Sequence, residues 1–149
     1  MAVNQSEAQQ FSIPLPRSLD TRIHLRLSTR AKAIVLSLAT ASQDDAASVA
    51  AMGSFVYALP NRYDANQPLS TILFSNESTL EFTTRLAKLL ARRTGLPTYV
   101  TNSVSFANAG MGGTVEEEME GFKNIVDVAL AKIQAAGVGA GARNGISSS

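Results

Sequence analysis

The stretch that decides the fold reads STLEFTTRLAKLLARRTGLPTYVTN and covers residues 78–102. Over residues 78–94, leucine and alanine recur at steps of three and four, which predicts an amphipathic helix. The apolar stripe of this helix consists of Leu80, Leu86, Ala87, Leu90 and Ala91. Gly95 and Pro97 predict its end, because glycine adopts the left-handed cap conformation and proline cannot continue a helix. Residues 98–106 then predict a strand.

A second helix is predicted beyond this strand, and both helices carry signals for their first turns. Ser78 with Glu81 matches the capping box, in which two side chains accept hydrogen bonds from free backbone N–H groups. Thr114 with Glu117 matches it again. The second helix is expected to end at Gly137. Its apolar residues predict one stripe that faces an apolar surface; they are Val115, Met119, Phe122, Val126, Ala129 or Leu130, and Ile133.

The N-terminal half predicts strands. Residues 11–15 indicate a short edge strand, because the prolines in and beside it are poorly tolerated in a central one. Residues 22–27 alternate polar and apolar side chains, as a strand with one solvated and one buried face does. The apolar run at 34–38 predicts a strand that is covered on both faces. Residues 53–59 and 69–74 predict two more strands.

The element order predicts an α+β fold, with a mostly antiparallel sheet of about five or six strands packed with two helices. A chain of 149 residues favours one domain. We expect that domain to span residues 11–135. Residues 1–10 predict a disordered lead, and residues 136–149 predict a flexible Gly/Ala/Ser tail.

The composition limits the classes of function. The net charge is +1 and only 17% of residues are charged, so no global field attracts nucleic acid or a membrane. The chain has no cysteine, which excludes disulfides, thiolate catalysis and cysteine metal sites. The first residues lack the basic and apolar regions of a secretory signal. We therefore expect a protein of the cytoplasm, with the nucleus as a second compartment.

Residues that could carry catalysis or bind a cofactor form no constellation. His24 is the lone histidine and lies on the polar face of its predicted strand, so we expect it to face solvent. Ser54 follows Gly53, but no glycine completes the nucleophile elbow. The glycine-rich loop 110–113 precedes a helix, yet the glutamates that follow would repel a phosphate. We expect no enzyme activity, no cofactor and no metal site.

Two groups of side chains are candidates for partner binding. The basic group consists of Arg85, Lys88 and Arg92, which share a helix face, with Arg93 beside them. Such a group is often only a solvated helix surface, and the functional alternative is an acidic protein partner. The apolar group is the exposed part of the second helix stripe, with Met119, Phe122 and Val126 as candidates. Sheet residues are the alternative apolar surface.

Three segments resemble the proteasome assembly chaperone 4 family. They are LAKLLARRTG at residues 86–95, TYVTN at 98–102 and EEEMEGF at 116–122. The resemblance covers residues 68–122, and the strands before it match in pattern. The long last helix, the tail and the loop 44–52 are departures that suggest a fungal-type member.

The resemblance implies a small α+β protein that forms a heterodimer with a proteasome assembly chaperone 3 of similar fold. That pair would bind proteasome α-subunits, notably the fifth, and promote α-ring assembly of the core particle without catalysis. The alternative is a small dimeric scaffold or adaptor for other protein partners. A small hydrolase is a third class, but the sequence offers it no base and no elbow.

Overall fold

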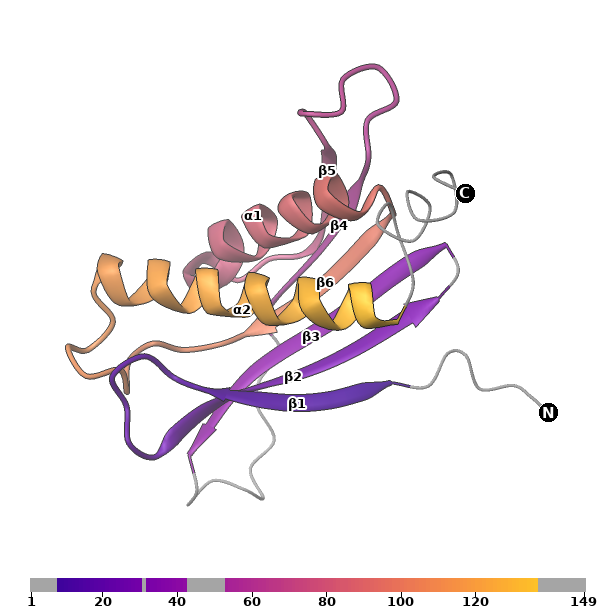
Figure 1. The fold of residues 1–149 in the computed structure, drawn as a ribbon. Helices are drawn as coiled ribbons and strands as arrows, with labels where there is room; N and C mark the ends of the chain where they lie inside the picture. Colours follow the sequence, from indigo (N-terminus) through magenta and orange to yellow (C-terminus); the bar gives the residue numbers. More distant parts are fainter. Residues whose placement is uncertain (1–7, 31, 43–52, 137–149) are drawn as a thin grey trace.

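The computed structural model describes residues 8–30, 32–42 and 53–136. They form one six-stranded sheet, in the order β1-β2-β3-β6-β4-β5, with two helices (Figure 1). The strands are β1 (Gln9–Pro14), β2 (Thr21–Arg30), β3 (Ala33–Ser42), β4 (Ser54–Leu59), β5 (Leu69–Phe74) and β6 (Thr98–Ser103). The helices are α1 (Glu77–Thr94) and α2 (Val115–Ala135). Neighbouring strands are antiparallel except β3 and β6, so the predicted α+β class is confirmed.

Both helices pack on the same face of the sheet (Figure 1). The hydrophobic core lies between the helices and the sheet. Every second residue of the central strands is buried in it, as Ile23, Leu36, Val56 and Val100 show. Side chains on the other face, such as Val35, are half-exposed. The prediction that residues 34–38 are covered on both faces is therefore wrong. The apolar run looked two-sided because small and β-branched residues also occupy the open face.

The first helix begins one residue earlier than its sequence predicted. Its N-cap is Asn76, whose side chain accepts a hydrogen bond from the backbone N–H of Ser78 at 3.2 Å. Ser78 is therefore a residue of the first turn, and the predicted Ser78–Glu81 capping box is wrong. Asparagine is as good an N-cap as serine, so the sequence carried two competing signals. The predicted C-terminal cap is confirmed, because Gly95 has a φ of 72°.

The second helix has the predicted Thr114–Glu117 capping box. Its buried face differs from the predicted stripe, since Val115 and Met119 are 73% and 60% exposed. The buried positions are Glu117, Gly121, Ile125, Val126, Ala129 and Ile133. A rotation of the stripe places a carboxylate rather than Val115 against the protein interior. Hydrophobicity alone cannot reveal this, because a carboxylate can be buried where hydrogen-bond donors surround it.

The predicted boundaries of the domain fall partly outside the described residues. β1 begins at Gln9, so two residues of the expected lead belong to the sheet. Helix α2 ends at Ala135 with Ala136 as its cap. Gly137, the predicted tail and the loop 44–52 lie outside the part of the chain that the structure describes.

A buried polar chain joins the helix layer to the sheet. The hydroxyls of Ser54 and Thr79 lie 2.9 Å apart, and Asn102 donates to the hydroxyl of Thr83 at 3.2 Å. Ser54 also donates to the backbone oxygen of Asn76. Buried polar groups of this kind are stable only when each has a partner, so they fix how α1 docks on β4 and β6.

Candidate partner-binding surfaces

The first candidate surface is the basic face of α1, which we define as Arg85, Lys88 and Arg92. These residues line a depression of about 330 Å³ together with Leu89 and Phe122. Their spacing of three and four residues places them on one side of the helix, as predicted. Arg93 is exposed but does not line this depression. The structure therefore brings together three of the four predicted cations beside an aromatic side chain from α2.

The three predicted apolar candidates on α2 differ in their exposure to solvent. Phe122 is half-buried, and the guanidinium of Arg85 lies 5.1 Å from its ring centroid, within cation–π range. Met119 is accessible at the surface. Val126 is only 7% exposed and belongs to the core. Its place in the fold is explained by packing against the sheet, whereas Met119 and Phe122 remain candidates for partner contact.

The second candidate surface is the aromatic band on the open face of the sheet, which we define as Phe55, Tyr57, Tyr99, Leu69 and Phe74. The rings of Tyr57 and Tyr99 stack at 4.4 Å and 21°, and Phe55 lies 6.4 Å from Tyr99. Burial, and then the neighbouring Tyr99, raise the pKa of the Tyr57 phenol. Side chains of β4 and β6 therefore form a continuous aromatic surface where no helix covers the sheet.

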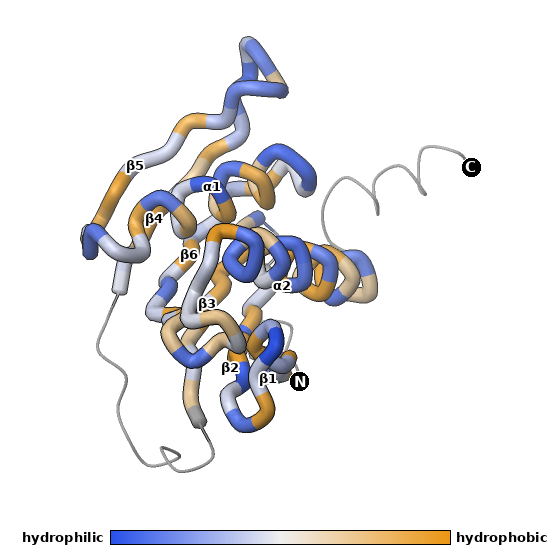
Figure 2. Tube along the Cα trace, turned by 90° about the vertical axis from the view of Figure 1, so that its left-hand side faces the viewer, coloured by the Kyte–Doolittle hydropathy of each residue, from blue (hydrophilic) through white to orange (hydrophobic). Residues whose placement is uncertain are grey.

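The aromatic band continues onto the edge strand. Phe74 pairs with Phe55 and Leu69 pairs with Leu59, so these side chains lie on the open face. Every residue of β5 is exposed, although four of its six residues are large and apolar. Figure 2 shows these hydrophobic stretches along β5, at the edge of the sheet. Exposed apolar residues on a sheet edge mark a surface that another chain can cover.

The other half of the open face is polar and basic. Arg22, His24 and Arg26 alternate along β2 and are exposed, as predicted for His24. Ser54 is fully buried on the helix side of the sheet, so it lies on the opposite face from His24. These two residues therefore cannot act together as nucleophile and base.

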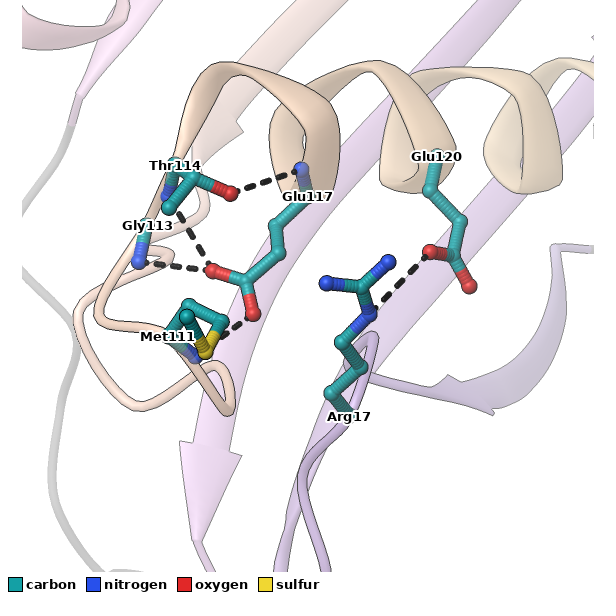
Figure 3. Close-up of polar contacts among 6 residues, drawn as sticks. All are labelled: Arg17, Met111, Gly113, Thr114, Glu117 and Glu120. Atoms are coloured by element: carbon teal, nitrogen blue, oxygen red, sulfur yellow. Dashed lines mark hydrogen bonds and ion pairs between the residues drawn. The ribbon is translucent and has the colours of Figure 1, made fainter.

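The start of α2 is held by Glu117, which is fully buried (Figure 3). Its carboxylate accepts hydrogen bonds from the backbone N–H groups of Met111 at 2.6 Å, Gly113 at 2.9 Å and Thr114 at 3.0 Å. Burial raises the pKa of this carboxyl. The backbone donors, with the charge of Arg17, outweigh that effect, so the pKa lies below its ordinary value of 4.5. Glu117 thus ties the loop before α2 to the helix.

The turn between β1 and β2 packs against the same region. Arg17 forms an ion pair with Glu120 at 3.9 Å, as Figure 3 shows. A Cβ on Gly110 would meet the backbone oxygen of Arg17 at 2.6 Å, so glycine permits this close approach. The loop, the turn and the first turns of α2 therefore form one connected unit.

Within residues 8–30, 32–42 and 53–136, no group of three His, Cys, Asp or Glu side chains could hold a metal ion. Neither of the two described helices is long and apolar enough to cross a membrane.

The chain is similar to a known protein family and to a solved structure. The model of proteasome assembly chaperone 4 matches residues 22–104, which is more than half of the chain. This chain belongs to that family. No curated protein matches it. A solved structure of a chaperone complex for yeast 20S proteasome assembly is similar, with a TM-score of 0.50 and 15% identity. That match covers 87% of this chain and 97% of the other, and it supports the fold.

The region matched to proteasome assembly chaperone 4 runs from β2 to just beyond β6. It contains the basic face of α1 and every residue of the aromatic band. The EEEMEGF segment at 116–122 lies outside it, as do β1 and α2. The family assignment therefore rests on the sheet and α1. Membership places the protein among chaperones of proteasome assembly, which is not an enzyme class.

Sequence reasoning missed the aromatic band as a specific site. The signal was present, because Phe55 and Tyr57 alternate along one strand. What the sequence lacked was the pairing of β4 with β6, which brings Tyr99 against both. It also missed the buried Glu117, although the capping box that involves this residue was recognised.

Proposed function

We propose that this proteasome assembly chaperone works as a heterodimer with a proteasome assembly chaperone 3, and that the pair binds α-subunits, notably the fifth. In this role it promotes α-ring assembly of the core particle. The observation that carries the proposal is the aromatic band. Because helices cover only one face of the sheet, these side chains are exposed to water in the isolated chain. A second protein can bury them.

The aromatic band suits a lasting contact with the partner chaperone. Tyrosine and phenylalanine are enriched at protein interfaces, because large rings bury much apolar area with few rotatable bonds. The stack of Tyr57 on Tyr99 is already ordered, so binding costs little side-chain entropy there. β5 extends the surface to the edge of the sheet. A partner that covers both would protect the apolar edge from aggregation.

The basic face of α1 suits the α-subunit. Arg85, Lys88 and Arg92 are solvated charges, which speed up encounter with an acidic surface more than they slow release. Fast and reversible contact is what an assembly factor needs, because it leaves the finished ring. α1 lies on one face of the sheet (Figure 1), whereas the alternation of burial along β4 and β6 places the aromatic band on the other, so both partners can bind at once.

The alternative is a dimeric scaffold or adaptor that uses the same open face for another protein. Membership of the proteasome assembly chaperone 4 family favours the first proposal. A pull-down with tagged chain from native extract, analysed by mass spectrometry, separates the two. We expect a second small chaperone and proteasome α-subunits with few mature β-subunits. Recovery of neither, from an extract that contains α-ring intermediates, would favour the adaptor.

Paired variants make this experiment specific. Tyr57→Ala with Phe74→Ser is expected to lose the partner chaperone, because both side chains belong to the aromatic band. Arg85→Glu with Lys88→Glu is expected to retain that chaperone and lose α-subunits. If both variants lost the same proteins, the assignment of two separate surfaces would be wrong.

A further inference from the structure

A groove lies between the first turns of α1 and α2, on the helix side of the molecule. Its volume is about 710 Å³, which is within the range of ligand-binding pockets. Phe82 and Phe122 line it, with their rings in an edge-on contact at 5.2 Å. Val115 and Met119 line one side, with 73% and 60% of their surfaces exposed. The groove is therefore apolar inside and open to solvent.

The lining of this groove carries more acidic than basic side chains. Glu77 and Glu81 come from α1, and Glu118 and Glu120 come from α2. Glu120 pairs with Arg17, whereas the other three form no ion pair with any residue that the structure describes. The cations in the groove lining are Arg85 and Lys123, and Arg85 lies over the Phe122 ring. The carboxylates outnumber the cations, so the groove attracts positive charge.

The groove is built from rigid parts. Glu117 fixes the first turn of α2 through three backbone hydrogen bonds. Phe82 also packs against Phe106, at 5.8 Å between ring centroids. A Cβ on Gly121 would lie 2.5 Å from the nearest atom of the Phe106 ring, so the absence of a side chain there permits that packing. A preformed site binds without a large ordering cost.

We propose that this groove binds a protein segment with an apolar anchor flanked by lysine or arginine. The anchor would contact Phe82, Val115 and Met119, and so remove their exposed surface from water. The flanking cations would pair with Glu77, Glu81 and Glu118. The basic face of α1 selects the opposite charge, so the two helix surfaces recognise different segments. The proposed function does not depend on this groove.

Three nine-residue peptides test the proposal by fluorescence anisotropy at low salt. The first has a central Leu-Phe pair flanked by lysines. In the second, glutamates replace the lysines, and in the third, serines replace the Leu-Phe pair. We expect the first peptide to bind the full chain at least about tenfold more tightly than either of the others.

Substitutions in the chain locate the binding. Glu118→Lys is expected to lower the affinity for the first peptide by about tenfold, and Met119→Ser to lower it several-fold. Glu116→Lys is the matched control, because it makes the same charge change on the same helix outside the groove. All three positions are exposed, and the two Glu→Lys changes both lie in the first turn of α2, so these two variants should lower the melting temperature by a similar small amount.

Three results would overturn the proposal. One is equal binding of the lysine and glutamate peptides, and another is equal loss in Glu116→Lys and Glu118→Lys. The third is self-association of the wild-type chain in sedimentation that Glu118→Lys abolishes, since the occupant would then be a second copy. The Glu118→Lys variant should still recover the partner chaperone in the pull-down. A failure of the groove proposal can therefore be told apart from a failure of the proposed function.

Discussion

The guanidinium of Arg85 lies 5.1 Å from the centroid of the Phe122 ring, and this contact joins α1 to α2 at the surface. Arg85 and Phe122 line both the basic depression and the acidic groove. The pair therefore separates two regions of opposite charge. Replacing Arg85 removes a cation from the basic depression and exposes an aromatic ring in the acidic groove. The effects of replacing Arg85 must therefore be compared with the effects of replacing Lys88, which lines the depression alone.

Reversal of charge on the basic face should weaken binding to α-subunits. Arg85→Glu with Lys88→Glu is expected to lower the affinity of the chaperone pair by at least about tenfold, and to reduce its salt dependence. Isothermal titration calorimetry at two salt concentrations measures both effects. Lys32→Glu, at an exposed position in the β2–β3 turn, is the control. Unchanged affinity in the double variant would exclude this surface.

Removal of an aromatic side chain from the open face should weaken the chaperone heterodimer. Tyr99→Ala is expected to weaken it by about 2 kcal/mol, since tyrosines at interface centres are frequent hot spots. Sedimentation or calorimetry with purified partner chaperone measures this loss. Thr71→Ala, beside Tyr57 at the edge of the band, should have little effect. If Tyr99→Ala bound the partner as tightly as the wild type, the partner surface would lie elsewhere.

The N-cap of α1 can be identified by two substitutions. Asn76→Ala is expected to cost about 1 kcal/mol of stability, because the first turn loses an acceptor. Ser78→Ala should cost less, since its hydroxyl donates to Asn76 and accepts no backbone N–H in the cap. Urea unfolding at equilibrium measures both values. A larger loss in Ser78→Ala would restore the serine cap that the sequence suggested.

Glu117 should make stability depend on pH in the acid range. Its pKa in the folded protein is below 4.5, so the contribution of the carboxylate is fully present above that value. It is lost as the pH falls from 4.5 through the lowered pKa of the folded state. Thermal melts from about pH 3 to about pH 7 should show this loss. Glu117→Gln should be less stable at pH 7 and should have a flatter profile.

Glycine at position 53 should tolerate no side chain. A Cβ there would overlap the backbone oxygen of Asn102, and neither strand can move without breaking the sheet. Gly95→Ala is the comparison, because it faces open space and has only a left-handed φ, which costs about 1–2 kcal/mol. We expect Gly53→Ala to lower the midpoint of urea unfolding more than Gly95→Ala does. The reverse order would show that β4 can shift away from β6.

Local sequence patterns were sufficient to predict most elements and the family. Periodicity and caps predicted both helices, and the Gly95 end of α1 was correct because glycine alone accepts a φ of 72° without strain. The segments around residues 86–102 indicated proteasome assembly chaperone 4, which the match over residues 22–104 shows. These are local features, since each depends on residues within a few positions of one another.

The candidate surfaces follow from tertiary packing and could not be predicted from local patterns. The parallel pairing of β3 with β6, and the position of β4 beyond it, bring Tyr57 against Tyr99 although 42 positions separate their numbers. The rotation of α2 buries Glu117 and exposes Met119. The donors to this carboxylate come from the loop just before α2, but that loop is held in place by its close approach to Arg17 in the turn between β1 and β2. Exposure and pairing depend on which segments meet in space. Those contacts are long-range, and no single stretch of sequence encodes them.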